Sequence, residues 1–326
     1  MIDPDADAVP ASAERSQLVR EAFAARVSNL TSAAERVQEA EDPEAIHDLR
    51  VGARRMDAML RTWDGLFHAR AREDARRVLR RLRRRLGEAR ELETQVALLE
   101  PRVSQYGDAT ARLLERLRNR LARRTDRAAK RLRPKRIKRL LTRMDDVASD
   151  LDSRPIAKPR AFDQALKRAL ETGAVARVAV EVAARQEDDG ALHQARLAVK
   201  KWRYTLECID TIVPEAESEV TSSLREMQEL LGTIQDRVVL IDTIERFGEE
   251  EDQAGFQAIV EELKAEKRTA LHEFKTLAAS LRAKPVRAGG EIGGRPPRAS
   301  TGADPVPADE RWERMAHWLH GERIEK

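Results

Sequence analysis

The sequence predicts an all-α protein, and three observations lead to this prediction. Only 4% of its 326 residues are aromatic while 36% are charged, whereas strands favour aromatic and β-branched side chains. Apolar residues recur every three or four positions along most of the chain, which is the spacing of one helix face. A pair of sequence blocks also occurs in both halves of the chain, so we expect an internal duplication of a helical bundle.

The first half of the chain is expected to hold four helices. The first, over about 13–40, carries an apolar stripe that would face a core: Val19, Phe23, Val27, Leu30, Ala34 and Val37. Three more are expected over about 43–68, 70–100 and 108–147, with Pro101 near the end of the third and Pro134 kinking the fourth. Residues 149–160 are predicted to be a connector, because they include two prolines.

The second half is expected to repeat this arrangement. The apolar spacing predicts helices over about 161–187, 191–212, 215–247 and 253–282. The two bundles would then span about 12–150 and 160–282. Residues 283–326 are rich in Pro and Gly and are expected to form a flexible tail with one short helix, Arg311 to His320.

The duplication is predicted from two pairs of blocks. The first pair is IHDLRVGARRMDAML (46–60) and LHQARLAVKKWRYTL (192–206), which are offset by 146 residues. The second pair is LGEARELE (86–93) and LGTIQDRV (231–238), which are offset by 145 residues. Two matched pairs in one order and at near-constant spacing indicate two equivalent bundles.

Each copy of the first block places basic residues opposite its apolar residues. On a helical wheel, His47, Arg50 and Arg54 share one face. The second copy has a matching face with two flanking residues: His193, Arg196, Lys200 and Tyr204, with Lys201 and Arg203 beside them. Because the apolar face must be buried, the basic face would point to solvent or into a cavity.

Basic stripes recur on other predicted helices, although a solvated surface is the alternative for any single stripe. They comprise Arg76, Arg80, Arg83 and Arg90, then Arg112, Arg116, Arg120, Arg123 and Arg127, and finally Lys264, Arg268 and Lys275. Residues 46–145 hold 30 Lys and Arg but only 13 Asp and Glu. If the stripes converge, they form a cationic channel that would hold a polymer of phosphates through arginine forks and lysine ammonium groups.

The sequence has none of the usual features of a membrane or secreted protein. No apolar run approaches the roughly 20 residues that span a bilayer, and the acidic N-terminus does not resemble a signal peptide. The single cysteine, Cys208, cannot form an internal disulfide. We therefore expect a cytoplasmic protein without membrane insertion.

The repeated H-x-x-R-x-x-x-[RK]-[RK] blocks, with the LGEARELE and LGTIQDRV pair, resemble the CHAD family, the conserved histidine α-helical domain, over about 12–282. The resemblance implies two pseudo-symmetric four-helix bundles with a basic cavity between them that binds inorganic polyphosphate, and association with polyphosphate granules in some members. The positions that match the motif are His47, Arg50, Arg54, Arg55, His193, Arg196, Lys200, Lys201, Arg203 and Tyr204.

The expected polyphosphate-binding set adds stripe residues to these positions: Arg76, Arg80, Arg83, Arg90, Arg116, Arg120, Lys264 and Arg268. The sequence departs from the family pattern at Asp57, where another basic residue is usual. Either the first-half site is weaker at this point or Asp57 lies outside the groove.

We expect a binding protein without catalytic residues, a cofactor or a metal site. The sequence has no phosphate-binding P-loop, no G-x-S-x-G elbow and no H-E-x-x-H motif. Nucleic-acid binding is the main alternative, because nucleic-acid phosphates also favour arginine stripes. The few aromatic residues are not interleaved with those stripes, however, so platforms for base stacking are missing. A helical scaffold whose tail recruits a partner is the third hypothesis.

Overall fold

The computed structural model of the protein describes residues 12–39, 45–132, 134–152, 159–210, 219–248 and 253–283. These residues are almost entirely helical and contain no strand, which confirms the all-α prediction. The predicted tail after residue 283 and its short helix lie outside the described residues.

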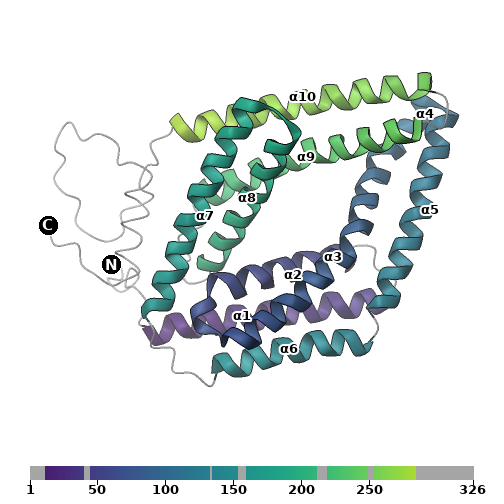
Figure 1. Ribbon diagram of the computed structural model, residues 1–326. Coiled ribbons are helices and arrows are strands. Elements are labelled where there is room, and N and C mark those ends of the chain that lie inside the picture. Colours follow the sequence, from purple (N-terminus) through teal and green to yellow (C-terminus); the bar gives the residue numbers. More distant parts are fainter. Residues whose placement is uncertain are drawn as a thin grey trace, which may run out of the picture.

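The first half contains α1 (Ser12–Glu39), α2 (Ala45–Thr62), η1 (Asp64–Leu66), α3 (Ala69–Leu99), η2 (Glu100–Arg102), α4 (Val103–Tyr106), α5 (Asp108–Arg131) and α6 (Pro134–Asp152). The second half contains α7 (Pro159–Gln186), α8 (Asp189–Ile209), α9 (Glu219–Gly248) and α10 (Gln253–Ala283). The long helices run around the sides of a four-sided frame (Figure 1). Helices α1, α2 and α6 form one side, α7 and α8 the next, α9 and α10 the third, and α5 with the end of α3 the fourth.

Two predicted helices end differently in the structure. The single kinked helix expected over about 108–147 is two helices, α5 and α6, and the second begins at Pro134. Proline has no backbone N–H and a fixed φ, so it suits a first helical turn better than a helix interior. Helix α2 also ends at Thr62 rather than near residue 68, and the 3-10 turn η1 follows it.

Consecutive helices pack in the same order in both halves. Helix α2 lies between α1 and α3, and α8 lies between α7 and α9. The larger apolar core takes residues from α1, α2, α6, α7 and α8 and from parts of α3, α5, α9 and α10, whereas a smaller core joins the far ends of α3, α5, α9 and α10. The two halves are therefore connected at two places, and this pairing supports the predicted duplication. None of the described helices is long and apolar enough to cross a membrane.

Candidate functional site

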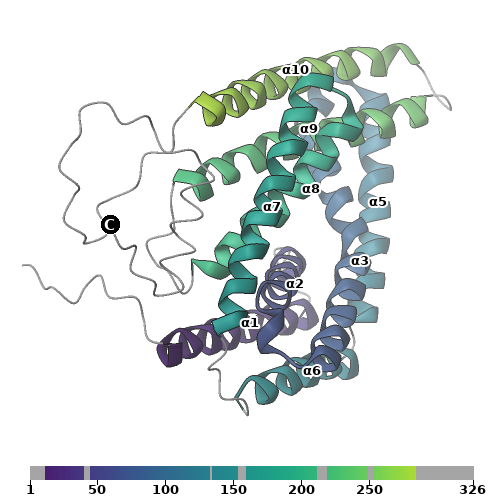
Figure 2. The same cartoon turned by 60° about the vertical axis from the view of Figure 1, so that its left-hand side comes forward.

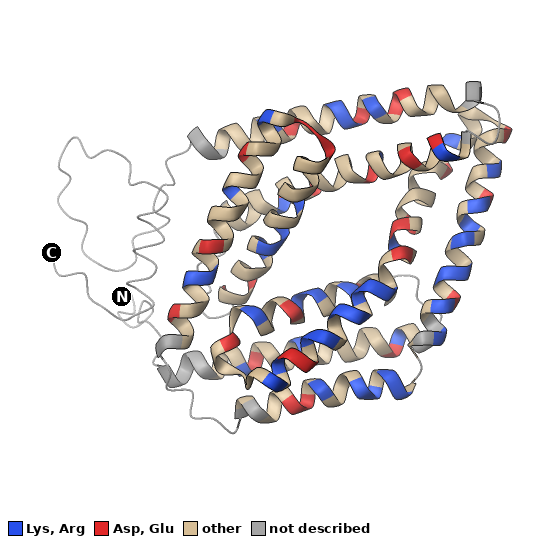
Figure 3. Cartoon of the chain, viewed as in Figure 1, with Lys and Arg blue, Asp and Glu red and all other residues tan. Residues whose placement is uncertain are grey.

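Helices α2 and α8, which carry the two copies of the H-x-x-R block, pack against each other. Arg54 of α2 reaches Tyr204 of α8, and its Nη1 donates to the phenol oxygen over 3.5 Å. The guanidinium carbon lies 5.9 Å from the centroid of the Tyr204 ring. Figure 3 shows lysine and arginine on both helices. The structure thus brings together the basic stripes that the sequence predicted for the two halves.

Four half-buried cations meet at this contact, and we refer to them as the central cluster: Arg50 and Arg54 from α2, with Arg196 and Lys200 from α8. The pKa of Lys200 falls to about 7, first because burial disfavours the ammonium ion and then because Arg196 and Arg54 are close. Burial, followed by the charge of Arg54, also lowers the pKa of Arg50. The cluster therefore concentrates positive charge from both halves in a partly dry site.

Two donors of the central cluster have no partner among the described residues. The Nη1 atom of Arg50 and the Nε atom of Arg196 are buried without a hydrogen-bond partner. Neither arginine forms an ion pair with any described residue, and the same holds for Lys200. Buried donors are nearly always paired in folded proteins, and a bound anion would supply charge-assisted partners here.

Two carboxylates lie near the central cluster without closing an ion pair to it. The charge of Glu93 on α3 favours the protonated form of Arg50 and so raises its pKa. The charge of Asp236 on α9 does the same for Arg196 and Lys200. Burial raises the pKa of Asp236, although Arg196 opposes this shift. The sequence analysis did not single out either residue. The feature that could have identified them is the acidic residue that each copy of the second repeated block contains.

The two motif histidines have different surroundings. The Nδ1 atom of His193 lies 2.8 Å from Oε1 of Gln235 on α9, so the amide fixes the orientation of this imidazole. His47 is also half-buried, but it makes no such hydrogen bond within the described residues. An imidazole at the edge of a cationic site can donate a hydrogen bond to an anion.

A glycine lies close to the motif arginine in each half. A Cβ atom at Gly87 would lie 3.4 Å from Nη1 of Arg50, and one at Gly232 would lie 3.7 Å from Nη2 of Arg196. The two glycines are equivalent positions in the second pair of repeated blocks. The same approach of arginine to glycine in both halves supports the predicted duplication.

The model of the CHAD domain matches residues 21–245. The chain belongs to the CHAD family. No protein of curated function matches it.

Two solved structures share the CHAD fold of this chain. The crystal structure of the CHAD domain from the plant Ricinus communis is 20% identical, with a TM-score of 0.58, and the match covers 83% of this chain and 92% of that chain. PptA from Streptomyces chartreusis is 18% identical, with a TM-score of 0.59, and the match covers 82% of this chain and 99% of that chain. At this level of identity the likeness concerns the fold alone.

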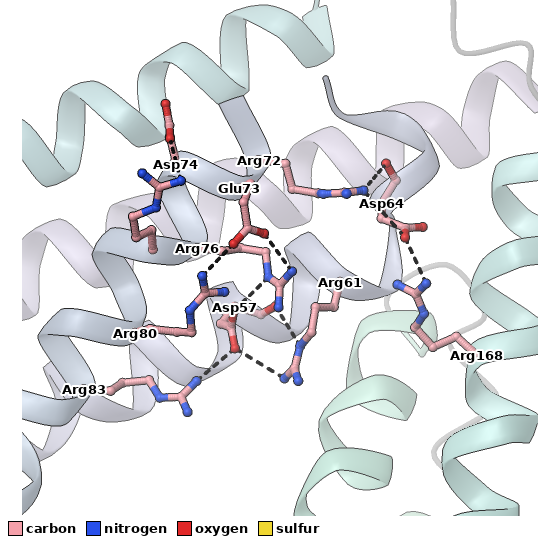
Figure 4. A network of polar contacts seen from close by, with 11 residues as sticks. Asp57, Arg61, Asp64, Arg72, Glu73, Asp74, Arg76, Arg80, Arg83 and Arg168 are labelled. Carbon is pink, nitrogen blue, oxygen red and sulfur yellow. Dashed lines mark hydrogen bonds and ion pairs between the residues drawn. The ribbon is translucent and has the colours of Figure 1, made fainter. Parts of the chain in front are cut away.

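The CHAD motif position that departs from the family, Asp57, is the centre of an ion-pair network (Figure 4). Its side chain is only 4% exposed and accepts from Arg76 over 3.1 Å and from Arg83 over 2.9 Å. Arg61, one turn along α2, lies 3.4 Å away. Asp57 therefore neutralises arginines that the sequence assigned to the ligand.

Glu73 extends this network along α3. Its carboxylate lies 3.2 Å from Nη1 of Arg76 and 2.6 Å from Nη2 of Arg80. We refer to Asp57, Glu73 and their arginines as the Asp57 network: Arg61, Arg76, Arg80 and Arg83. Three of the predicted polyphosphate-binding residues, Arg76, Arg80 and Arg83, are thus already paired with acids of the same chain.

The equivalent positions of the second half carry the opposite charges. Arg203, which aligns with Asp57, is only 8% exposed, and its Nε donates to Gln228 over 3.0 Å. Its Nη1 pairs with Glu207, which aligns with Arg61. The first half thus has an acid with arginine partners, and the second half has an arginine with an acidic partner at the equivalent position. Arg203 is therefore already paired within the chain.

The other predicted residues surround the central cluster or lie away from it. Arg55 pairs with Glu207 across α2 and α8 over 3.6 Å, and Lys201 is exposed. Arg90, which pairs with Glu93, is a charged neighbour of Arg50. Their positions fit the rim of one site on α2, α3 and α8.

The stripes of α5 and α10 do not join this site in the contacts that the structure shows. Arg116 lies over the ring of Phe247 at 4.5 Å, and Phe247 is about 16 Å beyond Asp236 along α9. Lys264 pairs with Glu261 over 3.0 Å, while the remaining two members of the predicted binding set on these helices are exposed: Arg120 and Arg268. A continuous channel through all the stripes stays a prediction.

Proposed function

We propose that this CHAD chain binds inorganic polyphosphate at the central cluster and does not transform it. The observation that carries the proposal is a group of half-buried cations, drawn from both halves, of which Arg50, Arg196 and Lys200 form no ion pair with any described residue. Polyphosphate places a negative charge on every repeating unit, so a single chain could contact Arg50 and Arg54 on one side and Arg196 and Lys200 on the other. CHAD domains are also associated with polyphosphate-related proteins, and the proposal includes association with polyphosphate granules.

The proposal of binding without catalysis rests on the chemistry of the described side chains. The potential nucleophile Cys208 is buried, and burial raises the pKa of its thiol, which disfavours the reactive thiolate. Among the described residues, no group of three or more His, Cys, Asp or Glu could hold a metal ion. The protein groups near the cluster are suited to holding phosphates by charge and hydrogen bonds.

Calorimetric titration with long-chain polyphosphate tests the proposal. We expect R50A/R54A and R196A/K200A each to weaken binding by about tenfold to a hundredfold, because each removes two charge-assisted contacts from a partly desolvated site. The matched control is R76A/R80A, which removes two arginines that the chain already neutralises. If only one half's substitutions weaken binding, or if the control weakens it as much, the shared site is wrong.

Salt dependence and competition separate polyphosphate from nucleic acid. Affinity should fall steeply as salt rises, because contacts to a polyanion release counter-ions. Long-chain polyphosphate should displace duplex DNA readily, whereas DNA should not displace polyphosphate. The reverse order of displacement would favour the nucleic-acid alternative.

A further inference from the structure

Helix α7 carries an exposed apolar seam that the polyphosphate site does not use. Val175, Val178 and Val182 are 57%, 62% and 39% exposed. Glu171 and Arg185, both exposed, bracket them, and the five positions advance by alternating steps of four and three residues. This is the spacing of a helix seam that packs against another helix, and the five side chains fall within an arc of about 80°.

The opposite face of α7 is fully used inside the protein. Ala176 and Ala183 are buried in the larger core, and Trp202 of α8 packs so closely on Gly173 that an added Cβ atom would lie 2.9 Å from the indole. Figures 1 and 2 show α7 on the outer side of its pair with α8. The seam therefore points away from the core.

A fourth exposed apolar residue lies on α8, outside the seam. Leu197 is 47% exposed. It lies on the basic face of α8 with His193 and Lys200, opposite the fully buried Ala195 and Val199. The other large apolar residues that the described chain leaves exposed are the three valines of the seam, and an exposed apolar patch marks an interaction surface.

We propose that the seam is the contact surface of a homodimer in which two copies of α7 pack antiparallel about Val178. Glu171 and Arg185 are each seven residues from Val178. An antiparallel pair therefore places Glu171 of each copy opposite Arg185 of the other, so that both ends of the seam are complementary. A parallel pair would place like charges together at both ends.

The charges at the two ends are available for such a contact. Glu171 forms no ion pair with any described residue. Arg185 pairs with Glu181 one turn away, but its side chain remains 71% exposed, and an exposed pair of this kind contributes little stability. The end charges would set the orientation of the two copies more than the affinity.

The size of the seam sets the strength of the dimer. Its five positions span about 20 Å of one helix, so the surface that two copies bury against each other is smaller than that of a stable dimer. The dimer should therefore be weak, and its population should rise with protein concentration. An isologous contact of this kind closes on itself and does not form fibres.

Sedimentation of the full chain over a wide range of concentration tests the dimer. We expect a reversible monomer–dimer equilibrium that V178D weakens by at least about tenfold, since the two new carboxylates would face each other across the two-fold axis. Q257D adds the same charge at an exposed position of α10 and should leave the equilibrium unchanged. A chain that stays monomeric, or a dimer that V178D does not weaken, would overturn the proposal.

Charge exchange tests the antiparallel arrangement. E171R and R185E should each weaken the dimer, whereas the double substitution E171R/R185E should restore it, because opposite charges again meet at both ends. Melting curves of all three variants control for folding. A double variant that stays as weak as the single ones would exclude the antiparallel pairing.

Cross-linking gives an independent readout. Cys208 is 1% exposed, so a thiol introduced by Val178→Cys should be the reactive one, and mild oxidation should link two copies at the two-fold axis. Gln257→Cys should not cross-link. If the chain's own residues 284–326 cover the seam instead, the full chain stays monomeric and dimerises only after truncation at Ala283, and the proposed dimer of the full chain is then wrong.

Discussion

The central cluster and the Asp57 network are both rich in arginine, but their acidic surroundings differ. In the network, buried Asp57 and half-buried Glu73 pair directly with the arginines around them. In the cluster, Glu93 and Asp236 lie nearby, yet no ion pair with a described residue reaches Arg50, Arg196 or Lys200. An arginine stripe is thus a candidate for an external anion only where the chain does not supply its own acids.

The second half sharpens this contrast. Its counterpart of the network has Arg203 at the centre, with Glu207 and Gln228 as partners. Gln228 aligns with Arg83 of the network. The second half therefore has a neutral residue where the first half has this arginine, and an arginine where the first half has Asp57. Both versions satisfy their buried charges internally, whereas no ion pair among the described residues reaches Arg50, Arg196 or Lys200.

The largest expected effect comes from removing the acid of the network. Asp57→Asn should lower the free energy of unfolding by about 3 kcal/mol, because it leaves partly buried arginines without their counter-ion. Denaturation by urea measures this change. Glu73→Gln is the matched control and should cost less than about 1 kcal/mol, since the Glu73 side chain is 42% exposed. Equal losses for the two variants would contradict the central role of Asp57.

Removing a cation from the cluster should act in the opposite sense on stability. Lys200→Met keeps the apolar stem, removes a buried charge and relieves repulsion by Arg196 and Arg54. We expect the free energy of unfolding to stay unchanged or to rise by about 1 kcal/mol, while the affinity for polyphosphate falls by about tenfold. Urea denaturation and calorimetry measure the two quantities. A loss of stability as large as that of Asp57→Asn would remove the distinction between the two regions.

Removing the acid beside the cluster should strengthen binding. Asp236→Asn deletes a negative charge that acts on Arg196 and Lys200, so the affinity for polyphosphate should rise by about threefold to tenfold. Asp242→Asn on the same helix is the control, because Asp242 is exposed and is not among the charges that act on the cluster. Equal gains for both variants would point to net charge rather than to the site.

The smallest expected signal is proton uptake on binding. The pKa of Lys200 is about 7 in the free protein, so this residue is mostly neutral at about pH 8, and bound phosphates would raise its pKa. Binding at that pH should take up as much as about one proton, and affinity should fall as the pH rises past 7. Calorimetry in two buffers with different ionisation enthalpies measures the uptake. Lys200→Met should abolish it, and persistence in that variant would assign the proton elsewhere.

The sequence predicted the helices and the orientation of their faces because both depend on local spacing. The repeated blocks identified α2 and α8, and the wheel placed His47, Arg50 and Arg54 opposite Leu49 and Ala53, which are fully buried. The 3.6-residue period of a helix fixes such relations within one element. The same reasoning found the family, since the motif residues are close in sequence, while the break at Pro134 was expected as a kink.

The tertiary structure alone decided which charges meet. Asp57 pairs with Arg76 and Arg83, which are 19 and 26 residues away, and Arg54 reaches Tyr204 across 150 residues. A helical wheel shows the same basic stripe whether or not an acidic residue of a neighbouring helix packs against it. Coulomb energy depends on the distance and burial of the two groups, and both are set by how helices distant in sequence pack, so only the fold could separate the neutralised arginines from the unpaired ones.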